Sequence, residues 1–391
     1  MTKEAIALQQ AGYLVTVIFC PMSPWGDSFD NQLFNKYPEI NWICVGAHPQ
    51  KNKFKYFFTR VRRKFWVLIY NSIGNIFNAA LKSAFLYSQD LECHALRHKA
   101  DLYIGHNLGS INAVVKASKK FQAKVAFDFE DFHRGESQLN SLQYIKVKTM
   151  EDKFSNLLDY ATAASPLIAK AYKELYPELD IQTVNNCFYK SYGFNELLNL
   201  STEKIKLFWF SQTVADGRGI EIVIKAMGLS GSDDYELTLL GNCSDYSKNF
   251  FISIAKENGV KENQLIFLNP VSEDEIVKIA AEHHIGLAVE IIKEENRNLC
   301  LTNKIFTYLL SGCAIVYSNT QAQKEFFNEN KDLGLGFNIG DFIELASVLQ
   351  TYKNDYKLLN YHRNNSFNAS KNWNWENESL KLISLVKQQL H

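Results

Sequence analysis

The sequence feature that most constrains the fold is a strand, a glycine-bearing loop and a helix in direct succession over residues 206–227. The apolar run Leu207–Phe210 has the length and aromatic content of a buried strand. A loop with Gly217, Arg218 and Gly219 follows, and the apolar residues after it recur at helical spacing. This succession is typical of an open α/β sheet with parallel strands.

The same loop is a candidate phosphate site. Backbone N–H groups and the positive end of the helix dipole face one small volume there. Gly217 and Gly219 let the backbone approach a phosphate, and Arg218 offers a two-pronged cation for a diphosphate. Since Gly-x-Gly without a third glycine is a weak signal, an ordinary turn with a solvated arginine fits the same residues.

Length and composition exclude several classes of protein. A chain of 391 residues is too long for one ordinary core and suits two domains. Basic and acidic residues balance at 42 each, whereas a general nucleic-acid binder would carry a basic excess. The seven cysteines are scattered and form no Cys-x-x-Cys pair, which argues against structural zinc and favours a cytoplasmic location.

Short apolar runs alternate with amphipathic segments along the chain, which predicts two doubly wound, Rossmann-like domains facing across a cleft. The first is expected at residues 1–190 and the second at 204–370, with a linker over 190–203. A last helix, 375–391, is expected to pack back on the first domain. Strands are expected at Tyr13–Cys20, Trp42–Gly46, Leu102–Gly105, Lys124–Asp128, Ala161–Ala164, Leu207–Phe210, Leu237–Leu240, Leu265–Leu268, Gly286–Val289 and Ala314–Tyr317. Helices are expected at Thr2–Ala11, Ser110–Phe121, Leu139–Leu158, Pro166–Leu175, Ile220–Met227, Tyr246–Asn258, Glu273–Glu282, Thr302–Leu310, Phe342–Lys353 and Trp375–Leu390.

Several motifs resemble a GT-B fold, group 1-type nucleotide-sugar glycosyltransferase. The C-terminal half is similar to the family's donor domain at Phe210–Glu221, Leu239–Asn242, Leu265–Ser272 and Thr302–Val316. The last of these resembles the NK-x-x-x-Y-x-x-x-G signature, which lies beside the donor's ribose and diphosphate. In the N-terminal half, Asp128–His133 resembles the acidic-histidine loop that faces the acceptor, and Asp159–Leu167 resembles a D-x-x-x-x-x-S-P junction.

The resemblance implies transfer of a sugar from a nucleoside-diphosphate donor to a glycan or lipid-linked acceptor, in cell-envelope polysaccharide or glycolipid synthesis. No metal and no cofactor beyond the co-substrate is implied, because cations and a helix N-terminus stabilise the leaving diphosphate. The implied donor-binding residues are Gln212, Gly217, Arg218, Gly219, Gly241, Glu290, Asn303, Lys304 and Thr307.

Some of these donor residues have simpler interpretations. Lys304 fits a solvated helical lysine, Asn303 fits a helix cap, and Glu290 fits a solvated strand end. Two positions also depart from the family pattern. Thr307 stands where many members carry a glutamate, and Gln212 stands where an arginine is usual. The departures leave open whether the anomeric configuration is retained or inverted.

The loop after the strand at Lys124–Asp128 supplies candidate acid–base residues. A carboxylate of Asp128, Glu130 or Asp131 could deprotonate an acceptor hydroxyl, and a nearby histidine could orient the sugar. The candidate histidines are His133, in the same loop, and His106, which ends another strand. A polar loop that caps the following helix is the simpler interpretation.

Basic and aromatic residues are interleaved over residues 51–66, and no Asp or Glu occurs between Ile40 and Gln89. This combination suits an anionic membrane surface or a lipid-diphosphate acceptor, so the protein is expected in the cytoplasm or peripheral at the inner face of the membrane. A solvated helix face with its aromatic residues in the core is the alternative. Nucleic-acid binding lacks a supporting fold signature.

The chain start raises a separate expectation. In the resembling family a strand precedes the helix that here starts at Thr2, and this strand is central in a doubly wound sheet. We therefore expect a gap in the first sheet, explained either by a late start of this sequence or by another segment that fills the gap.

Two other functions fit the sequence. A catalytically silent scaffold that binds nucleotide sugar would explain Thr307 and Gln212. A nucleotide-sugar epimerase of the same fold would need a sealed cleft without the basic-aromatic segment.

Overall fold

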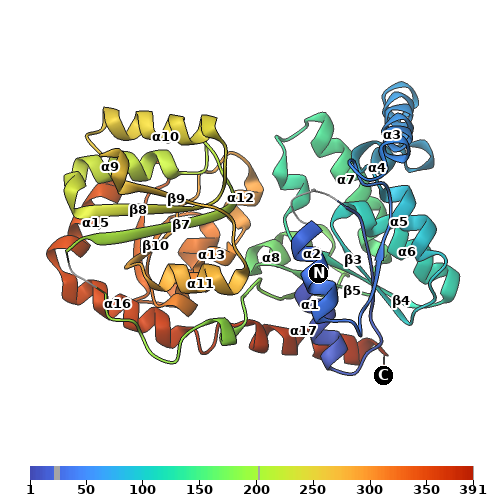
Figure 1. Cartoon of the computed structure of the whole chain (residues 1–391). Helices are drawn as coiled ribbons and strands as arrows, with labels where there is room; N and C mark the ends of the chain where they lie inside the picture. The colour runs from blue at the N-terminus through green and yellow to red at the C-terminus, as the bar shows by residue number, and fades with distance from the viewer. Residues whose placement is uncertain (22–26, 201–202, 391) are drawn as a thin grey trace. The chain divides into compact units, whose positions relative to one another are not determined.

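The structure is a computed structural model that describes residues 1–21, 27–200 and 203–390. It divides into two compact units, one formed by Met1–Val184 with Ser379–His391 and one formed by Asn185–Glu378 (Figure 1). Residues 201 and 202 of the predicted linker and residue 391 of the predicted last helix lie outside the described residues.

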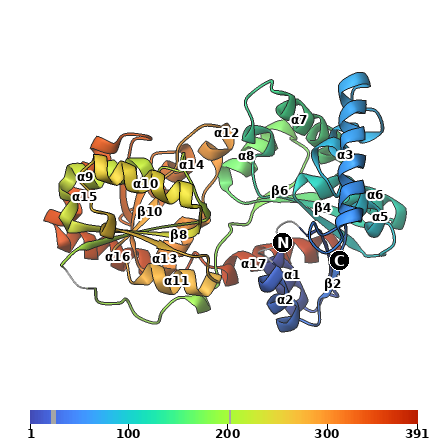
Figure 2. The ribbon, with the colours of Figure 1, turned by 45° about the horizontal axis from the view of Figure 1, so that its top comes forward.

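The second unit is built on one six-stranded parallel sheet with the order β12-β11-β10-β7-β8-β9. Helices cover both faces, with α9, α10 and α15 on one side and α11, α13 and α16 on the other (Figures 1 and 2). Its strands are β7 (Ile205–Val214), β8 (Tyr235–Cys243), β9 (Leu265–Leu268), β10 (Ile285–Ala288), β11 (Ala314–Ser318) and β12 (Gly334–Phe337). Its helices are α9 (Ile220–Gly231), α10 (Asp245–Glu257), α11 (Glu273–Ala281), α12 (Glu295–Leu299), α13 (Asn303–Ser311), α14 (Gln321–Glu329), α15 (Phe342–Asn354) and α16 (Tyr356–Ala369), and α17 (Trp375–Leu390) begins in this unit.

The central strand of this sheet is β7, which pairs with β8 and β10. Its residues Leu207–Phe210 are buried on both sides, as expected for a parallel strand covered by helices on each face. The register between β7 and β8 shifts between Phe210 and Thr213, so the end of β7 leaves the regular ladder. The loop to α9 starts from this irregular end.

The first unit contains two separate parallel sheets, β1-β2 and β3-β4-β5-β6. Its strands are β1 (Thr16–Phe19), β2 (Asn41–Cys44), β3 (Leu102–His106), β4 (Lys124–Phe129), β5 (Tyr160–Ala163) and β6 (Ile181–Thr183). Its helices are α1 (Thr2–Gln10), α2 (Asp27–Lys36), α3 (Lys53–Ile73), α4 (Ala79–Ala84), α5 (Ser88–Ala95), α6 (Ile111–Phe121), α7 (Leu142–Phe154) and α8 (Pro166–Leu175).

The division into two sheets bears on the expected gap. Within the described ranges β1 pairs only with β2, and β3 pairs only with β4, so each has one edge without a ladder partner. Side chains from α1, β3, β4, β5 and α17 pack together nearby, with Leu8, Ala126, Tyr160, Leu382, Leu385 and Val386 buried among them.

Most predicted strands and helices are present, and their ends differ for identifiable reasons. The strand expected from Tyr13 begins at Thr16, because the Tyr13 amide still donates to the Leu8 carbonyl at the exit of α1. The helix expected from Leu139 begins at Leu142, because the Ser141 hydroxyl accepts from the Tyr144 amide and caps it. The sequence pattern did not predict β6, α2, α5, α12, α14 or α16.

A buried ionic network fixes the loop that follows β4. The Arg134 guanidinium donates to the carboxylates of Glu151 and Asp152 on α7 and to the Tyr176 hydroxyl. Glu151 is fully buried and also accepts from the Tyr172 hydroxyl on α8 at 2.6 Å. The loop that carries the candidate acid–base residues is therefore tied to two helices.

We predict that Arg134→Met destabilises the protein by about 3–5 kcal/mol, because it leaves the Glu151 carboxylate buried without its cation. The loss is measured as the change in free energy of unfolding in urea. Lys148→Met, which removes an exposed ion pair to Asp152 on the same helix, is the control and should cost about 1 kcal/mol or less. Equal losses in the two variants would contradict a special role for the buried network.

Candidate functional site

The Tyr308 side chain links helix α13 to the sheet of the second unit. The Tyr308 hydroxyl lies 3.2 Å from the Phe208 carbonyl and 3.1 Å from the Leu287 carbonyl, where β7 and β10 stop pairing. Lys304 precedes Tyr308 by one helical turn, so both side chains lie on the same face of α13. The lysine ammonium is thereby placed at the carboxyl ends of these strands, where open α/β sheets bind ligands.

Glu290 lies just beyond β10 and is 4% exposed. Its backbone amide donates to the Ser318 hydroxyl at 2.7 Å. One carboxylate oxygen lies 3.0 Å from the Lys304 ammonium, and the other lies 3.4 Å from the Arg297 guanidinium. The simpler interpretations of Glu290 as a solvated strand end and of Lys304 as a solvated lysine are therefore wrong.

The glycine-bearing loop places Arg218 beside this ion pair. Gly217 and Gly219 have φ angles of 69° and 88°, in the left-handed region that favours glycine. The Arg218 guanidinium donates to the Ser211 hydroxyl at 3.0 Å and lies 6.0 Å from the centre of the Trp209 ring. The Lys304 ammonium lies 5.4 Å from the same ring, so the two predicted cations share one aromatic support.

A small cavity of about 70 Å³ opens between the loop and Glu290 and is lined by Gly217, Arg218, Glu290, Ile291, Lys293, Glu294 and Arg297. Burial, followed by the positive charge of Arg297, lowers the pKa of the Arg218 guanidinium. This crowding of cations favours an anionic ligand. A larger hollow of about 390 Å³, between α10 and β9, contains none of the predicted site residues.

The other predicted donor residues lie around this cavity or below it. Gln212 is exposed on the irregular end of β7. Gly241 on β8 has a φ of 150°, and a Cβ there would come within 2.2 Å of the Ser211 carbonyl oxygen. Asn303 is the first residue of α13 and is half-buried; Thr302 occupies the cap position, so the capping interpretation of Asn303 is wrong.

Two groups have interactions other than the predicted ones. Thr307 is fully buried, and its hydroxyl donates to the Asn303 carbonyl at 3.1 Å, which leaves no free donor for a ribose. The Gly217 amide donates to the Glu221 carboxylate in the first turn of α9. Glu221 therefore occupies one of the amides that the sequence offered to a phosphate.

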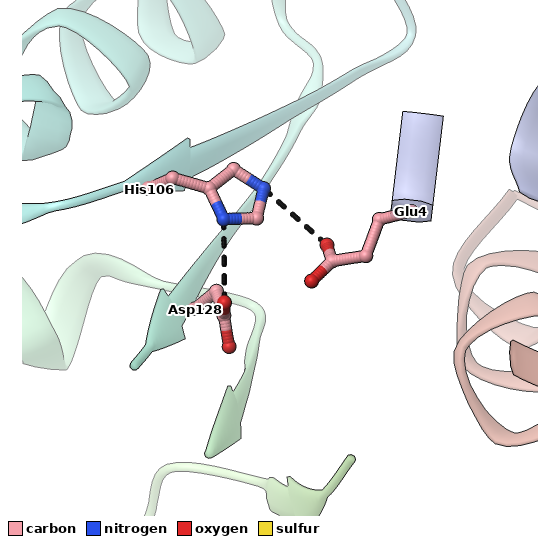
Figure 3. Close-up of side chains that lie close together, drawn as sticks. All are labelled: Glu4, His106 and Asp128. Carbon is pink, nitrogen blue, oxygen red and sulfur yellow. Dashed lines mark ion pairs between the residues drawn. The ribbon is translucent and has the colours of Figure 1, made fainter. Parts of the chain in front are cut away.

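In the first unit, His106 lies between carboxylates at the carboxyl ends of β3 and β4 (Figure 3). Its Nε2 lies 3.3 Å from Glu4, which comes from α1, and its Nδ1 lies 3.3 Å from Asp128. Glu130 lies 3.6 Å from the same Nδ1 and is the most exposed of the three carboxylates. The second Asp128 oxygen accepts from the Thr162 hydroxyl at 2.7 Å.

This arrangement sets the protonation of the cluster. Burial alone would lower the pKa of His106, but Glu4, with Asp128 and Glu130, raises it well above 6.5. Burial would also raise the pKa of Glu4, but the N-terminal ammonium and His106 hold it at about 2. Burial and the Glu4 charge raise the pKa of Asp128 above its usual value despite His106. The histidine is thus held as a cation, and Asp128 is the most basic carboxylate.

Glu4, His106 and Asp128 also form a group whose ligand atoms lie close enough to hold a metal ion. However, the two imidazole nitrogens face different carboxylates, as Figure 3 shows. An ion between His106 and either carboxylate could not use the nitrogen that faces the other. The arrangement suits an imidazolium between two carboxylates better than three ligands around one ion.

The structure does not bring all predicted acid–base residues together. The imidazole Nδ1 of His133 lies 3.1 Å from Glu136, and its ring packs against Phe127 and Phe129 in the interior. The Asp131 carbonyl, 3.4 Å from the Tyr172 hydroxyl, belongs to the same loop. Asp128, Glu130 and His106 form one cluster, whereas His133 pairs with its own loop.

Residues 222–372, within the second unit, match the family described as glycosyl transferase-like. No curated protein matches the sequence. Sucrose-phosphate synthase from Thermosynechococcus elongatus has a similar structure, with a TM-score of 0.72, 14% identity, and coverage of 99% of this chain and 91% of that chain. HepE from Anabaena in complex with UDP has a TM-score of 0.70 and 14% identity, with coverage of 99% of this chain and 96% of that chain. A glycosyltransferase from Rickettsia africae has a TM-score of 0.66 and 13% identity, with coverage of 99% of this chain and 93% of that chain.

The second unit is a glycosyl transferase-like domain, and the whole chain has the GT-B fold. These findings confirm the predicted fold class, and the match over residues 222–372 agrees with the family predicted for the second unit.

Sequence reasoning missed several residues of this GT-B protein's candidate sites. Lys293 and Arg297 line the cavity beside Arg218, and Trp209 supports two cations. The basic residues in the segment after β10 were an available signal. Glu4 had none, because its pairing with His106 joins two distant segments of the chain.

We predict that the stability contribution of His106 is greatest at low pH. Because its folded pKa lies above the unfolded value of about 6.5, this contribution is fully present below that pH and is lost as pH rises through the folded pKa. The difference in free energy of unfolding between wild type and His106→Gln should shrink by about 1 kcal/mol per pH unit within that window.

The control is His362→Gln, because burial lowers the pKa of His362. Its stability contribution should instead grow as pH rises from its folded pKa to about 6.5 and then stay constant. A difference for His106→Gln that stays constant from acidic to alkaline pH would contradict the charged state assigned to the cluster.

Proposed function

We propose that this protein transfers a sugar from a nucleoside-diphosphate sugar to a glycan or lipid-linked acceptor, in the synthesis of cell-envelope polysaccharide or glycolipid. The observation that carries the proposal is the group of four cations around Glu290: Arg218, Lys293, Arg297 and Lys304. They lie beside the start of α9, whose dipole also favours an anion. A leaving diphosphate is the charge that such a site would stabilise.

The donor chemistry is supported by similar structures of HepE, which were determined with UDP and with UDP-glucose. In this chain the Arg218 guanidinium is held by a hydroxyl, so its charge is available to a diphosphate. Lys304 is held by Glu290, so it would act on the donor together with that carboxylate. Because four cations supply the positive charge, we propose that transfer needs no metal ion and no further cofactor.

The acid–base step is proposed for the cluster in the first unit. The raised pKa makes Asp128 the best proton acceptor among the three carboxylates, so it would take the proton of the acceptor hydroxyl. The His106 imidazolium beside it would stabilise the ionised carboxylate before transfer. Glu130, at 44% side-chain exposure, would accept a hydrogen bond from an acceptor hydroxyl.

A second candidate function is a catalytically silent protein that binds nucleotide sugar. It is favoured by one observation, the buried Thr307 whose hydroxyl donates within its own helix. Such a protein would bind the donor without hydrolysing it or transferring its sugar.

We also propose that the protein works in the cytoplasm, at the inner face of the membrane. A lipid-linked acceptor would be reached there, and the basic-aromatic segment over residues 51–66 supports this location.

We predict that Arg218→Ala weakens the binding of UDP by roughly 10–100-fold, the usual effect of losing a charge-assisted hydrogen bond. Lys304→Ala should weaken it similarly. Binding is measured by calorimetry and by the thermal shift that UDP induces. Lys261→Ala, which removes an exposed ion pair in the same unit, is the control and should leave both readouts unchanged. If both site variants bind UDP as wild type does, the donor site lies elsewhere.

We predict that Asp128→Asn lowers the rate of sugar transfer by roughly 10²–10⁴-fold, the usual contribution of a general base, with UDP binding unaffected. Transfer is measured with radiolabelled UDP-sugars and a membrane lipid extract as acceptor. Glu136→Gln, which alters the His133 pair instead, is the control and should change the rate much less. Donor binding by wild type without hydrolysis or transfer of any sugar would favour the silent protein.

A further inference from the structure

Helix α3 exposes an unusually apolar face. Six large apolar side chains form an apolar stripe and are between 46% and 86% exposed: Phe54, Phe57, Phe58, Val61, Phe65 and Leu68. Their spacing of three and four residues places all six on one side of the helix. Exposed apolar residues continue at Ile73, the last residue of α3, and beyond the helix at Ile76 and Phe77. In a water-facing helix this side would be polar.

The opposite side of α3 is fixed to the first unit. Thr59 is buried, the Arg63 guanidinium donates to the Ser83 carbonyl at 2.8 Å, and the Trp66 indole donates to Gln89 at 3.0 Å. These contacts set the rotation of the helix about its axis. The apolar stripe therefore cannot turn inward while these contacts hold. Figures 1 and 2 show α3 at the rim of the first unit, beside α4.

Basic residues flank the apolar stripe on both sides. On an ideal helix of 3.6 residues per turn, Lys53, Arg60 and Lys64 fall along one border and Lys55 and Arg62 along the other. Arg62 is paired with Asp90, whereas no ion pair involves the other four within the described part of the chain. The helix itself contains no Asp or Glu. Its charge therefore complements an anionic surface.

We infer that α3 lies in the surface of an anionic lipid bilayer, with the apolar stripe in the acyl region and the basic borders at the lipid phosphates. A helix that lies in the plane of a membrane has this pattern, an apolar stripe bordered by cations. The opposite side of such a helix is free to be fixed to a domain, as it is in α3. None of the described helices is long and apolar enough to cross a bilayer.

The biological purpose of this membrane contact rests on the proposed function. A protein that transfers sugar to a lipid-linked acceptor must meet that acceptor at the membrane. Since α3 belongs to the first unit, the membrane contact would lie on the same unit as the His106 cluster. A bilayer is favoured over a second copy of the chain because unpaired cations bordering an identical stripe would repel each other.

The test is sedimentation of the full chain with phosphatidylcholine vesicles that contain about a third phosphatidylglycerol. The double variant Phe54→Ser/Phe58→Ser should lower the fraction bound by about tenfold or more, because two aromatic side chains no longer leave water. Lys53→Gln and Lys64→Gln should each lower vesicle binding about fivefold. Added salt should also lower vesicle binding, because it screens the attraction between the cations and the lipid phosphates. Pure phosphatidylcholine vesicles should bind weakly.

The control is Leu229→Ser/Tyr246→Ser, which removes two exposed apolar side chains from the second unit and should leave vesicle binding unchanged. All variants change exposed residues, so their thermal stability should match that of wild type. Wild type that fails to sediment with anionic vesicles overturns the inference. So does self-association that the stripe variants abolish while vesicles have no effect, because the occupant is then a second copy.

UDP binding, measured on the same samples, separates this inference from the proposed function. Vesicle binding without UDP binding leaves the membrane helix standing and removes the glycosyl transfer proposal. UDP binding without vesicle binding does the reverse.

Discussion

The candidate donor site depends on the ion pairs that the buried Glu290 carboxylate makes with Lys304 and Arg297. This carboxylate is almost inaccessible to water, yet it faces two cations, Lys304 at 3.0 Å and Arg297 at 3.4 Å. A buried carboxylate without a cation would be strongly destabilising, and so would the cations without it. The single negative charge of Glu290 lies among the positive charges of Arg218, Lys293, Arg297 and Lys304. The cluster therefore keeps a net positive charge. The proposed diphosphate would therefore bind without displacing the ion pairs of Glu290.

The candidate site in the first unit has the opposite balance. Two cations, His106 and the N-terminal ammonium, lie among the three carboxylates of Glu4, Asp128 and Glu130, so the cluster carries excess negative charge. One of these carboxylates, Asp128, has a raised pKa. Excess positive charge suits the leaving group of sugar transfer, and excess negative charge suits removal of a proton from a hydroxyl. The two clusters therefore offer the two kinds of chemistry that the proposed reaction requires, one in each unit.

The sequence predicted what depends on local pattern. The strand, loop and helix at Leu207–Met227, the NK-x-x-x-Y helix and the strand before Asp128 were all visible as short motifs with a fixed spacing. It could not predict pairings between distant segments, so Glu4 beside His106 was missed. Nor could it separate His133 from Asp128, because contacts with distant residues hold that loop, among them the Arg134 network and the bond from the His133 amide to the Tyr172 hydroxyl. Short or polar elements such as β6 and α12 carry too few apolar residues to leave a pattern.

The two separate sheets of the first unit give the His106 cluster a second role. No backbone ladder joins β1 to β3 within the described residues, in contrast to the continuous sheet of the second unit. Side chains connect the two parts instead: Leu8 and Val15 pack in one cluster with Leu102 and Ile104, and the ion pair of Glu4 with His106 joins α1 to the end of β3. Side-chain contacts lack the cooperative pairing of a ladder, so this junction depends strongly on each of them. The His106 imidazolium, which lies beside the proposed base Asp128, thus also helps to hold α1 against β3. A change in its protonation would affect the pKa of Asp128 and the contact between α1 and β3.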